Sequence, residues 1–211
     1  MESLLKAGLD IYAAAHSGPT PDIYERLREE TLASTEIPQM QVGILVGRFL
    51  KLMAKISGAQ RVVEVGTFTG YSALCIAEGM NEGGEVITCD IDAETNAIAQ
   101  KYWAQVAWGK RITPRLGPAL ETIQSIEGPI DMVFIDADKV NYTNYWEALV
   151  PKVRSGGLLI VDNVLWSGEV LNPETEAGIA IHALNEHVLH DGRVDHVLLT
   201  LRDGLMMAVK R

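Results

Sequence analysis

The feature that most constrains the fold is an alternation of short apolar runs and helical segments that begins at Arg61. The runs are rich in Val and Ile, and strands that are apolar throughout are typical of a parallel sheet that is covered on both faces. The alternation therefore predicts a doubly wound α/β fold. The strands are expected at residues 61–66, 85–90, 111–116, 130–136 and 156–163, and the helices between them near 70–80, 92–107, 117–126 and 141–154.

The carboxyl-terminal part breaks this alternation. A helical segment over 173–190 precedes two apolar runs, 194–201 and 205–211, which flank an Asp203-Gly204 turn. Two strands joined by such a tight turn form an antiparallel hairpin. We therefore predict a Rossmann-like sheet of seven strands that is mostly parallel and includes an antiparallel strand near the carboxyl terminus, with helices on both faces.

The amino-terminal part reads as helices alone. They are expected over 2–16, 21–32 and 40–56, and the third has apolar residues at three- and four-residue steps, the pattern of one buried helix face. A length of 211 residues fits one compact domain. We predict a single domain in which the helices of residues 1–57 cover the ligand sites and residues 61–211 form the Rossmann-like core.

Charge and cysteine content limit the partners and the compartment. A formal net charge of -10 argues against nucleic acid and anionic membranes, because binding to phosphates requires basic patches. A small molecule is the expected partner. Cys75 and Cys89 lie in apolar stretches, where a buried thiol is common, and this suits a reducing compartment. The first residues also lack the basic start and unbroken apolar core of a signal peptide, so we expect a cytoplasmic protein.

A glycine loop, EVGTFTGYS over 64–72, follows the first predicted strand. Loops at this end of such a sheet bind nucleotide-like ligands. When the dinucleotide fingerprint G-x-G-x-x-G is aligned on Gly66, Phe68 and Tyr71 replace its second and third glycines. Their side chains would keep a pyrophosphate away from the backbone and from the helix amino terminus. A ligand that contains adenosine without phosphates is compatible with this loop.

Two acidic residues indicate which ligand with adenosine and no phosphates the loop is suited to bind. Asp90 ends the second strand about 24 residues after Gly66, close to the roughly 20 expected of a carboxylate that accepts ribose hydroxyls. Glu64 is placed to face the ammonium group of an amino acid, and together the two residues describe S-adenosylmethionine. The alternatives are an ion pair of Glu64 with Arg61 or Lys55, and a helix cap at Asp90. Asp92 is better placed for that cap.

Polar residues end the fourth and fifth predicted strands. Asp136 ends the fourth, and Asp162 and Asn163 end the fifth. If these strands are neighbours, about 4.8 Å apart, two carboxylates and an amide oxygen converge and require a cation. Hard oxygen donors suit Mg²⁺, or else Mn²⁺ or Ca²⁺, with positions left open for two neighbouring substrate oxygens. The alternative is that Asp136 only ends a strand and that Asp162-Asn163 forms a turn.

Lys139 lies shortly after Asp136, on the same side of the expected crevice. A lysine in this place could take a proton from an acceptor hydroxyl or orient that hydroxyl. The alternative is a solvated ion pair between Asp138 and Lys139.

These residues resemble the cation-dependent O-methyltransferases, the group that contains the catechol and caffeoyl-CoA O-methyltransferases, and they are most similar to its small bacterial members. The resemblance runs from about Asp22 to the carboxyl terminus. It is carried by DIYERLREET, RVVEVGTFTGYSALCIA, LGPAL, DMVFIDADKVNYTNYWEAL, VRSGGLLIVDNVLWSGEV and DGLMMAVKR. It implies the fold of class I S-adenosylmethionine-dependent methyltransferases, whose parallel sheet is finished by one reversed strand.

The resemblance also implies roles for individual residues. The metal ligands would be Asp136, Asp162 and Asn163, and Lys139 would be the catalytic lysine. The S-adenosylmethionine contacts would be Met40, Val42, Glu64, Gly66, Thr67, Ser72, Asp90, Ala119 and Asp136. Met40 and Val42 fall where the helix entering the domain closes over the cofactor. Trp166 falls where the family packs the acceptor ring, with ordinary loop packing as the alternative.

Two departures from the family pattern affect these expectations. After Met40-Gln41 the chain reads VGILVGRFL, where many relatives have a stretch similar to Ser/Thr-Pro-acid-x-Gly-Gln, so polar cofactor contacts from Val42 onward are missing. Arg202 stands before Asp203-Gly204 where relatives often have a smaller residue, near a surface that dimers of the family use. The resemblance implies a homodimer.

The expected function is transfer of a methyl group from S-adenosylmethionine to a hydroxyl of a catechol-like, vicinal dihydroxy aromatic molecule, with a divalent cation. The alternatives are a methyltransferase of the same fold with another acceptor or without a metal, a non-catalytic S-adenosylmethionine-binding protein and a nicotinamide-dependent dehydrogenase. Phe68 and Tyr71 argue against the dehydrogenase. The presence of Lys139 together with the three candidate metal ligands argues against a protein that only binds the cofactor.

Overall fold

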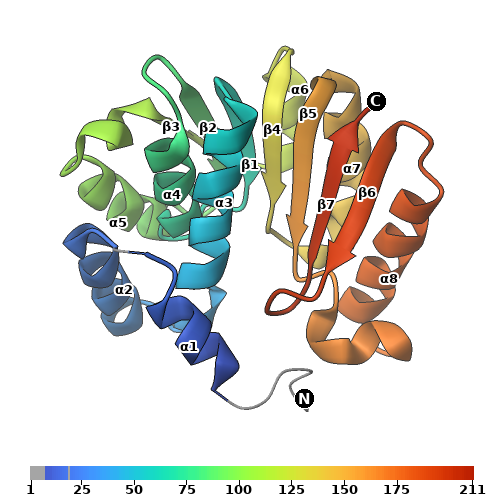
Figure 1. Ribbon diagram of the computed structural model, residues 1–211, viewed down its shortest axis with the longest axis horizontal. Coiled ribbons are helices and arrows are strands. Elements are labelled where there is room, and N and C mark those ends of the chain that lie inside the picture. The colour runs from blue at the N-terminus through green and yellow to red at the C-terminus, as the bar shows by residue number, and fades with distance from the viewer. Residues whose placement is uncertain (1–7, 19) are drawn as a thin grey trace. The chain divides into compact units, whose positions relative to one another are not determined.

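The computed structural model describes residues 8–18 and 20–211, and its strands form a seven-stranded sheet (Figure 1). The strand order is β3-β2-β1-β4-β5-β7-β6. The strands are β1 (Arg61–Val65), β2 (Glu85–Asp90), β3 (Ile112–Leu116), β4 (Ile130–Ile135), β5 (Val153–Asp162), β6 (Val194–Leu199) and β7 (Leu205–Lys210). Strand β7 is antiparallel to both β5 and β6, whereas β4 pairs in parallel with β1 and β5, and β2 with β3. This arrangement confirms the predicted fold class, including the carboxyl-terminal hairpin.

Helices connect these strands and precede them. The α-helices are α1 (Leu9–Ala15), α2 (Asp22–Ser34), α3 (Ile44–Ser57), α4 (Tyr71–Gly79), α5 (Ala93–Trp103), α6 (Ala119–Ser125), α7 (Tyr142–Leu149) and α8 (Glu176–Leu189). Short 3-10 helices are η1 (Pro38–Met40), η2 (Ala107–Arg111), η3 (Lys139–Asn141), η4 (Val150–Lys152) and η5 (Trp166–Leu171). In the part of the chain that the structure describes, none of the helices combines the length and the apolar character needed to span a bilayer.

The third predicted helix begins later than expected. The prediction placed Met40 inside it, but η1 ends at Met40 and α3 begins at Ile44. Gly43 has an extended backbone, with φ -81° and ψ 173°, which does not continue a helix. Met40 is therefore the last residue of η1, and Val42 lies on the segment that connects η1 to α3, so neither belongs to the predicted helix, which corrects the expectation. For the first predicted helix, residues 2–7 lie outside the described residues, and α1 covers the remainder up to Ala15.

Two other predicted helices end early. The helix expected over 92–107 ends at Trp103, and the one expected over 141–154 ends at Leu149. Pro151 has no N–H to donate, so the chain after α7 forms only the short turn η4. As a result, β5 begins at Val153, earlier than the predicted start of the fifth strand.

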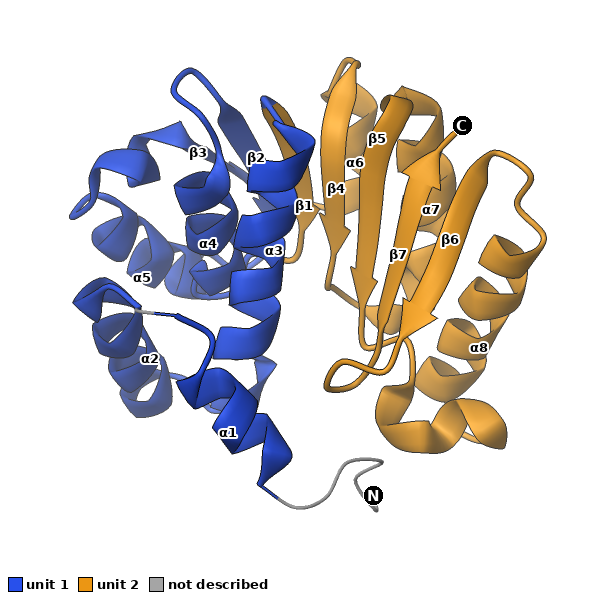
Figure 2. Cartoon of the chain, viewed as in Figure 1, with its two compact units in different colours: residues 1–60, 67–116 blue, residues 61–66, 117–211 orange. Residues whose placement is uncertain are grey.

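The chain divides into two compact units (Figure 2). The first contains residues up to Gln60 and Thr67–Leu116, and the second contains Arg61–Gly66 and Gly117–Arg211. In the first unit α3 packs against α4, whose residues are almost all buried. Glu78 of α4 accepts hydrogen bonds from Arg48 at 3.2 Å and from Lys51 at 2.6 Å. Because each of these charges has an opposite partner, they can lie between helices at low cost.

The second unit has its core between its strands and the helices α7 and α8. Residues 132–135 of β4 and 158–161 of β5 are buried. Trp146 and Leu149 of α7 and Ile181 and Leu184 of α8 are buried as well. Strands β4 and β5 are in register up to the pair Ile135 and Val161. The polar residues that follow each strand therefore emerge side by side at one edge of the sheet.

Candidate active site

In the first unit, the carboxylate of Asp90 holds the glycine loop. Its Oδ2 accepts hydrogen bonds from the backbone N–H groups of Thr67 at 2.9 Å and Phe68 at 2.7 Å. Its Oδ1 accepts from those of Ile91 at 2.7 Å and Asp92 at 3.0 Å. A carboxylate has about four lone-pair sites, so all of them are engaged by backbone donors. Any ribose hydroxyl would have to share an oxygen that already accepts two N–H groups.

The alternative assignment of Asp90 as the cap of α5 is wrong, because Asp92 has that role. Asp92 Oδ1 accepts from the backbone N–H groups of Glu94 at 2.8 Å and Thr95 at 3.3 Å, as the sequence predicted. The carboxylate of Asp90 instead accepts from the glycine loop through one oxygen and from the two residues that follow β2 through the other.

Helix α5 also contacts the glycine loop, through Trp103. Its indole Nε1 donates to the Gly70 carbonyl at 3.0 Å. Gly70 has a φ of 81°, and a Cβ there would lie 2.6 Å from the Trp103 ring and 2.7 Å from Ala99. Only glycine combines this left-handed backbone with this close contact. Sequence reasoning missed Trp103, because spacing alone does not show which α5 side chain faces the loop.

The other predicted cofactor residues of the first unit differ in exposure. Ser72 is buried in the first turn of α4, and Val42 is 8% exposed, whereas Met40 is 50% exposed. Gln41 lies between Met40 and Val42 in the chain and was not predicted to contribute to the site. Its Nε2 donates to Thr69 Oγ1 of the glycine loop at 3.0 Å and so ties this connecting segment to the loop.

In the second unit, the end of β1 lies directly against the end of β4. Gly66 has a φ of 97°, and a Cβ there would come within 1.8 Å of the Asp136 carbonyl oxygen. The Asp136 N–H donates to the Val65 carbonyl at 2.8 Å. Glu64 is fully buried within β1, and Ala119 is the first residue of α6. Only glycine at position 66 leaves room for the backbone of Asp136, the first residue of the candidate metal site.

Two of the three predicted metal ligands, Asp136 and Asn163, accept hydrogen bonds from the ammonium group of Lys139. Lys139 Nζ donates to Asp136 Oδ1 at 2.9 Å and to Asn163 Oδ1 at 2.8 Å. Asp162 precedes Asn163 and is 5% exposed, and Lys139 is 8% exposed. The structure thus brings these four residues together, as expected from neighbouring strand ends.

Burial and neighbouring negative charge disfavour the ionised form of two groups in this cluster. Burial, together with the negative charge of Asp136, raises the pKa of Asp162 well above its usual value. Burial and the charges of Asp136 and Asp162 likewise raise the pKa of Tyr142. The carboxylates of Asp136 and Asp162 and the amide oxygen of Asn163 have the donor chemistry of a Mg²⁺, Mn²⁺ or Ca²⁺ site, and two of these groups, Asp136 and Asn163, already accept hydrogen bonds from a cation. The residues present therefore fit such an ion.

The alternative of a solvated pair between Asp138 and Lys139 is wrong. Lys139 turns inward to Asp136, while Asp138 accepts hydrogen bonds from Asn141 and Tyr145, both at 2.5 Å. The sequence could not distinguish the two carboxylates, because both lie within reach of Lys139 along the chain.

Two aromatic rings complete the surroundings of Lys139. The ammonium lies 4.7 Å from the centre of the Tyr142 ring and 5.7 Å from that of Trp166. Its third hydrogen bond goes to Tyr142 Oη at 2.5 Å. Trp166, the predicted acceptor contact, is thus next to the predicted catalytic lysine. Tyr142 was not predicted, although its position three residues after Lys139, at a helix start, is a signal that could have suggested it.

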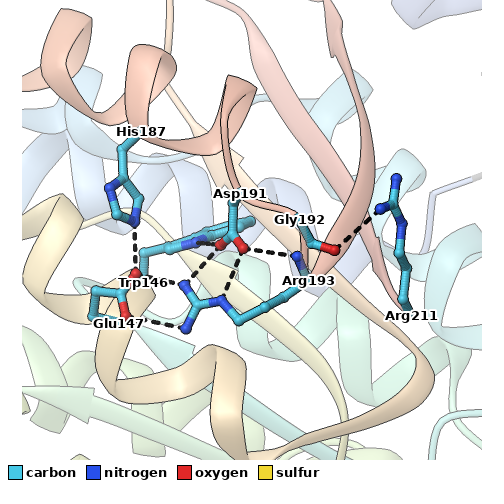
Figure 3. Close-up of polar contacts among 7 residues, drawn as sticks. All are labelled: Trp146, Glu147, His187, Asp191, Gly192, Arg193 and Arg211. Atoms are coloured by element: carbon cyan, nitrogen blue, oxygen red, sulfur yellow. Dashed lines mark hydrogen bonds and ion pairs between the residues drawn. The ribbon is translucent and has the colours of Figure 1, made fainter.

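A second polar cluster in this unit has a different character (Figure 3). Ligand-type atoms of Glu147, His187 and Asp191 lie within 4.8 Å of one another. The guanidinium of Arg193, however, already donates to Glu147 at 2.5 Å and to Asp191 at 2.7 Å. Trp146 Nε1 also donates to Asp191 at 2.9 Å. A cation of the protein itself fills this cluster, which joins α7 to the end of α8.

Comparison with known proteins gives one consistent family. A family model described as "O-methyltransferase" matches residues 14–211. The chain is 38% identical over 193 residues to "Catechol O-methyltransferase domain-containing protein 1" of Mus musculus, covering 87% of this chain and 74% of that protein. It is 35% identical over 207 residues to "Probable caffeoyl-CoA O-methyltransferase 2" of Dictyostelium discoideum, covering 94% and 90%.

The fold is also similar to solved structures. The O-methyltransferase from Bacillus cereus, crystallised in complex with SAH, superimposes with a TM-score of 0.89 at 30% sequence identity. The superposition covers 97% of each chain.

Proposed function

The chain belongs to the O-methyltransferase family, and on this basis we propose that it transfers the methyl group of S-adenosylmethionine to a hydroxyl of a vicinal dihydroxy aromatic molecule in a reaction that requires a divalent cation. The observation that carries the proposal is the convergence of Asp136 and Asn163 oxygens on one ammonium group, beside Trp166.

S-adenosylmethionine supplies a methyl group that its sulfonium has already activated for displacement. The glycine loop supports this choice, since Phe68 and Tyr71 stand where a dinucleotide would need glycines. The Bacillus cereus relative, which has SAH in its structure, supports it as well. We propose that the loop fixed by Asp90 presents its backbone to the cofactor, with Thr67 and Ser72 among the contacts.

We propose that Asp136, Asp162 and Asn163 hold the divalent cation. When bound, Mg²⁺ or a similar ion would supply positive charge that lowers the pKa of a nearby hydroxyl and would fix two adjacent substrate oxygens. The raised pKa of Asp162 supports this role, because a buried carboxylate beside Asp136 is stabilised by an added cation.

Lys139 and Trp166 would act on the acceptor itself. The Lys139 ammonium lies among the candidate ligands, where it can orient the acceptor hydroxyl or, in its neutral form, receive the proton. Trp166 would flank the acceptor ring. Holding the oxygen in line with the methyl group can contribute about 7–11 kcal/mol in favourable cases.

The same site would serve a methyltransferase that uses another acceptor or no metal, which is the nearest alternative. The names of the relatives, which refer to caffeoyl-CoA and catechol, favour the vicinal dihydroxy aromatic class. We also propose a homodimer and a cytoplasmic location, as the resemblance and the two buried thiols suggest.

A methyl-transfer assay tests the proposal. Purified protein would be incubated with methyl-labelled S-adenosylmethionine, Mg²⁺ and a panel of ortho-dihydroxy aromatics, with the meta-dihydroxy isomers as matched controls. We expect methylation of ortho acceptors, loss of turnover in EDTA and recovery when Mg²⁺ is restored. Turnover that persists in EDTA would refute the metal requirement, and equal methylation of the meta isomers would refute the acceptor class.

A further inference from the structure

The hydrogen bonds of Lys139 divide into two kinds. Its ammonium has three donors, and the structure gives it three acceptors: Asp136 Oδ1 at 2.9 Å, Asn163 Oδ1 at 2.8 Å and Tyr142 Oη at 2.5 Å. The first two acceptors are oxygens that the proposed function assigns to the divalent cation. The Tyr142 hydroxyl is not among the proposed ligands.

A divalent cation and an ammonium group cannot occupy the same two oxygens without strong repulsion. Cation binding therefore weakens the contacts of Lys139 with Asp136 and Asn163. A flexible lysine released in this way would be free to turn into solvent and leave the acceptor, unless another group held it.

We propose that Tyr142 is a positioning residue, which keeps Lys139 beside the acceptor when a divalent cation takes the oxygens of Asp136 and Asn163. This inference rests on the proposed function, because it uses the metal ligands assigned there. It adds that Lys139 occupies two of the proposed ligand oxygens in the metal-free protein, so that it competes with an incoming cation, and that Tyr142 retains Lys139 when the cation displaces it.

The surroundings of Tyr142 suit this role. Its side chain is completely buried at the first turn of α7, so its hydroxyl is a fixed acceptor. Lys139 lies one turn earlier, in η3, and needs no backbone movement to stay in contact. The faces of the Tyr142 and Trp166 rings also stabilise a cation that has lost carboxylate partners. A lysine held by Tyr142 in this way remains next to Trp166.

Tyr145 provides a matched control on the same helix. It is also a buried tyrosine of α7, but its hydroxyl donates to Asp138. Replacing it by phenylalanine removes a similar hydrogen bond near the site and leaves the acceptor of Lys139 in place.

The test measures Mn²⁺ affinity by calorimetry, in the presence of SAH, for the unmodified chain and its variants. We expect Lys139→Met to bind Mn²⁺ roughly tenfold more tightly, the scale of hydrogen bonds to a charged group, because the competing ammonium is gone. Tyr142→Phe should bind several-fold more weakly, because Lys139 then has no other acceptor. In the Lys139→Met background, Tyr142→Phe should have no further effect, and Tyr145→Phe should leave the affinity unchanged in either background.

Three results would overturn the inference while leaving the proposed function intact. They are Mn²⁺ binding that Lys139→Met leaves unchanged or weakens, an equal loss from Tyr142→Phe in both backgrounds, and an equal loss from Tyr145→Phe. If the unmodified protein binds no Mn²⁺ and turns over in EDTA, the proposed metal requirement fails first, and the inference fails with it.

A second measurement needs no variant, in case Tyr142→Phe does not fold. In unmodified protein with ¹³C-labelled lysine, nuclear Overhauser contacts between the Lys139 side chain and the Tyr142 ring should persist when Mg²⁺ is added. Loss of these contacts on Mg²⁺ binding would show that Lys139 leaves Tyr142, contrary to the inference.

Discussion

Asp162 is a buried carboxylate in a site rich in negative charge, and this determines what its removal does. Its raised pKa shows that the charged form is disfavoured in the metal-free protein. In metal-free buffer, Asp162→Asn should therefore leave the free energy of unfolding unchanged or raise it by about 1 kcal/mol. The same variant should lose Mg²⁺ affinity and at least about 10²-fold in methyl transfer. Urea denaturation and calorimetry measure the two effects.

Asp138→Asn is the control for this variant, because Asp138 is an exposed carboxylate on the neighbouring turn. It should keep Mg²⁺ affinity, and SAH affinity should be retained in both variants. Unchanged Mg²⁺ binding in Asp162→Asn would remove Asp162 from the proposed ligands.

Trp103 is expected to affect cofactor affinity without affecting the proposed cation site. Trp103→Phe removes the hydrogen bond to the Gly70 carbonyl and leaves a gap under the glycine loop. We expect SAH to bind more weakly by about 1 kcal/mol, a loss of several-fold, with unchanged Mn²⁺ affinity. Tyr102→Phe is the control: its hydroxyl donates to Glu30, so it should affect stability and not SAH binding. Equal SAH affinity in Trp103→Phe and the unmodified protein would contradict this role.

Among single residues, those that lie at the end of a predicted strand could be placed from the sequence. The positions of Asp136 and Asp162 could be predicted, because each comes directly after an apolar run that must be buried, and Asn163 follows Asp162 in the chain. Tyr142 and Trp103 could not, because their contacts depend on which side of a helix faces the loop. That direction depends on where each helix begins, to within a residue.

At the scale of elements, the cluster of Figure 3 joins α7 to the end of α8. Hydrogen bonds from Arg193 hold the pKa of Asp191 well below its usual value, and Arg193 lowers that of Glu147 as well. A carboxyl whose pKa is lower in the folded state stabilises the fold fully above its unfolded pKa of 3.8, and the contribution is lost as the pH falls through the folded value. This junction should therefore weaken in acid.

The prediction is that Asp191→Asn lowers the free energy of unfolding at pH 7 by about 1–2 kcal/mol and that the difference from the unmodified protein shrinks as the pH falls below 3.8. Urea denaturation at a series of pH values measures it. Asp195→Asn, which breaks an exposed pair with Arg211, is the control and should change little at any pH. A difference that stays constant with pH would show that the charge of Asp191 is not what stabilises the junction.

The ends of helices and strands could be predicted only where the residue types change clearly at the boundary. The strand at 85–90 was placed correctly, because it is a continuous β-branched run between polar residues. The helix expected from Met40 began late, because Gly43 adopts an extended conformation that apolar periodicity does not reveal. The contacts of Gln41 with the glycine loop arise in that same irregular segment, so they were missed with it.

At the scale of the whole molecule, the order of elements carried most of the predictive power. Alternating strands and helices followed by a hairpin allow few topologies, because parallel connections need crossovers and the Asp203-Gly204 turn requires an antiparallel pair. The antiparallel pairing of β6 with β7 was expected from this, although β6 ends at Leu199, before the predicted end of that strand at residue 201. The place of β7 between β5 and β6 was not predicted. The partition into two compact units could not, because it depends on packing between segments distant in sequence.

The choice between a methyl donor and a dinucleotide can also be tested on the whole molecule. A ligand that binds only the folded state stabilises it by about 2.7 kcal/mol at a hundredfold excess over its Kd. For a chain of this length each kcal/mol raises Tm by about 2–4 °C, so SAH should raise Tm by about 5–11 °C in differential scanning fluorimetry. NADH at the same concentration should raise it by little, because Phe68 and Tyr71 stand where its pyrophosphate would need glycines. A large shift with NADH and none with SAH would reverse the assignment of the glycine loop, and with it the donor of the proposed reaction.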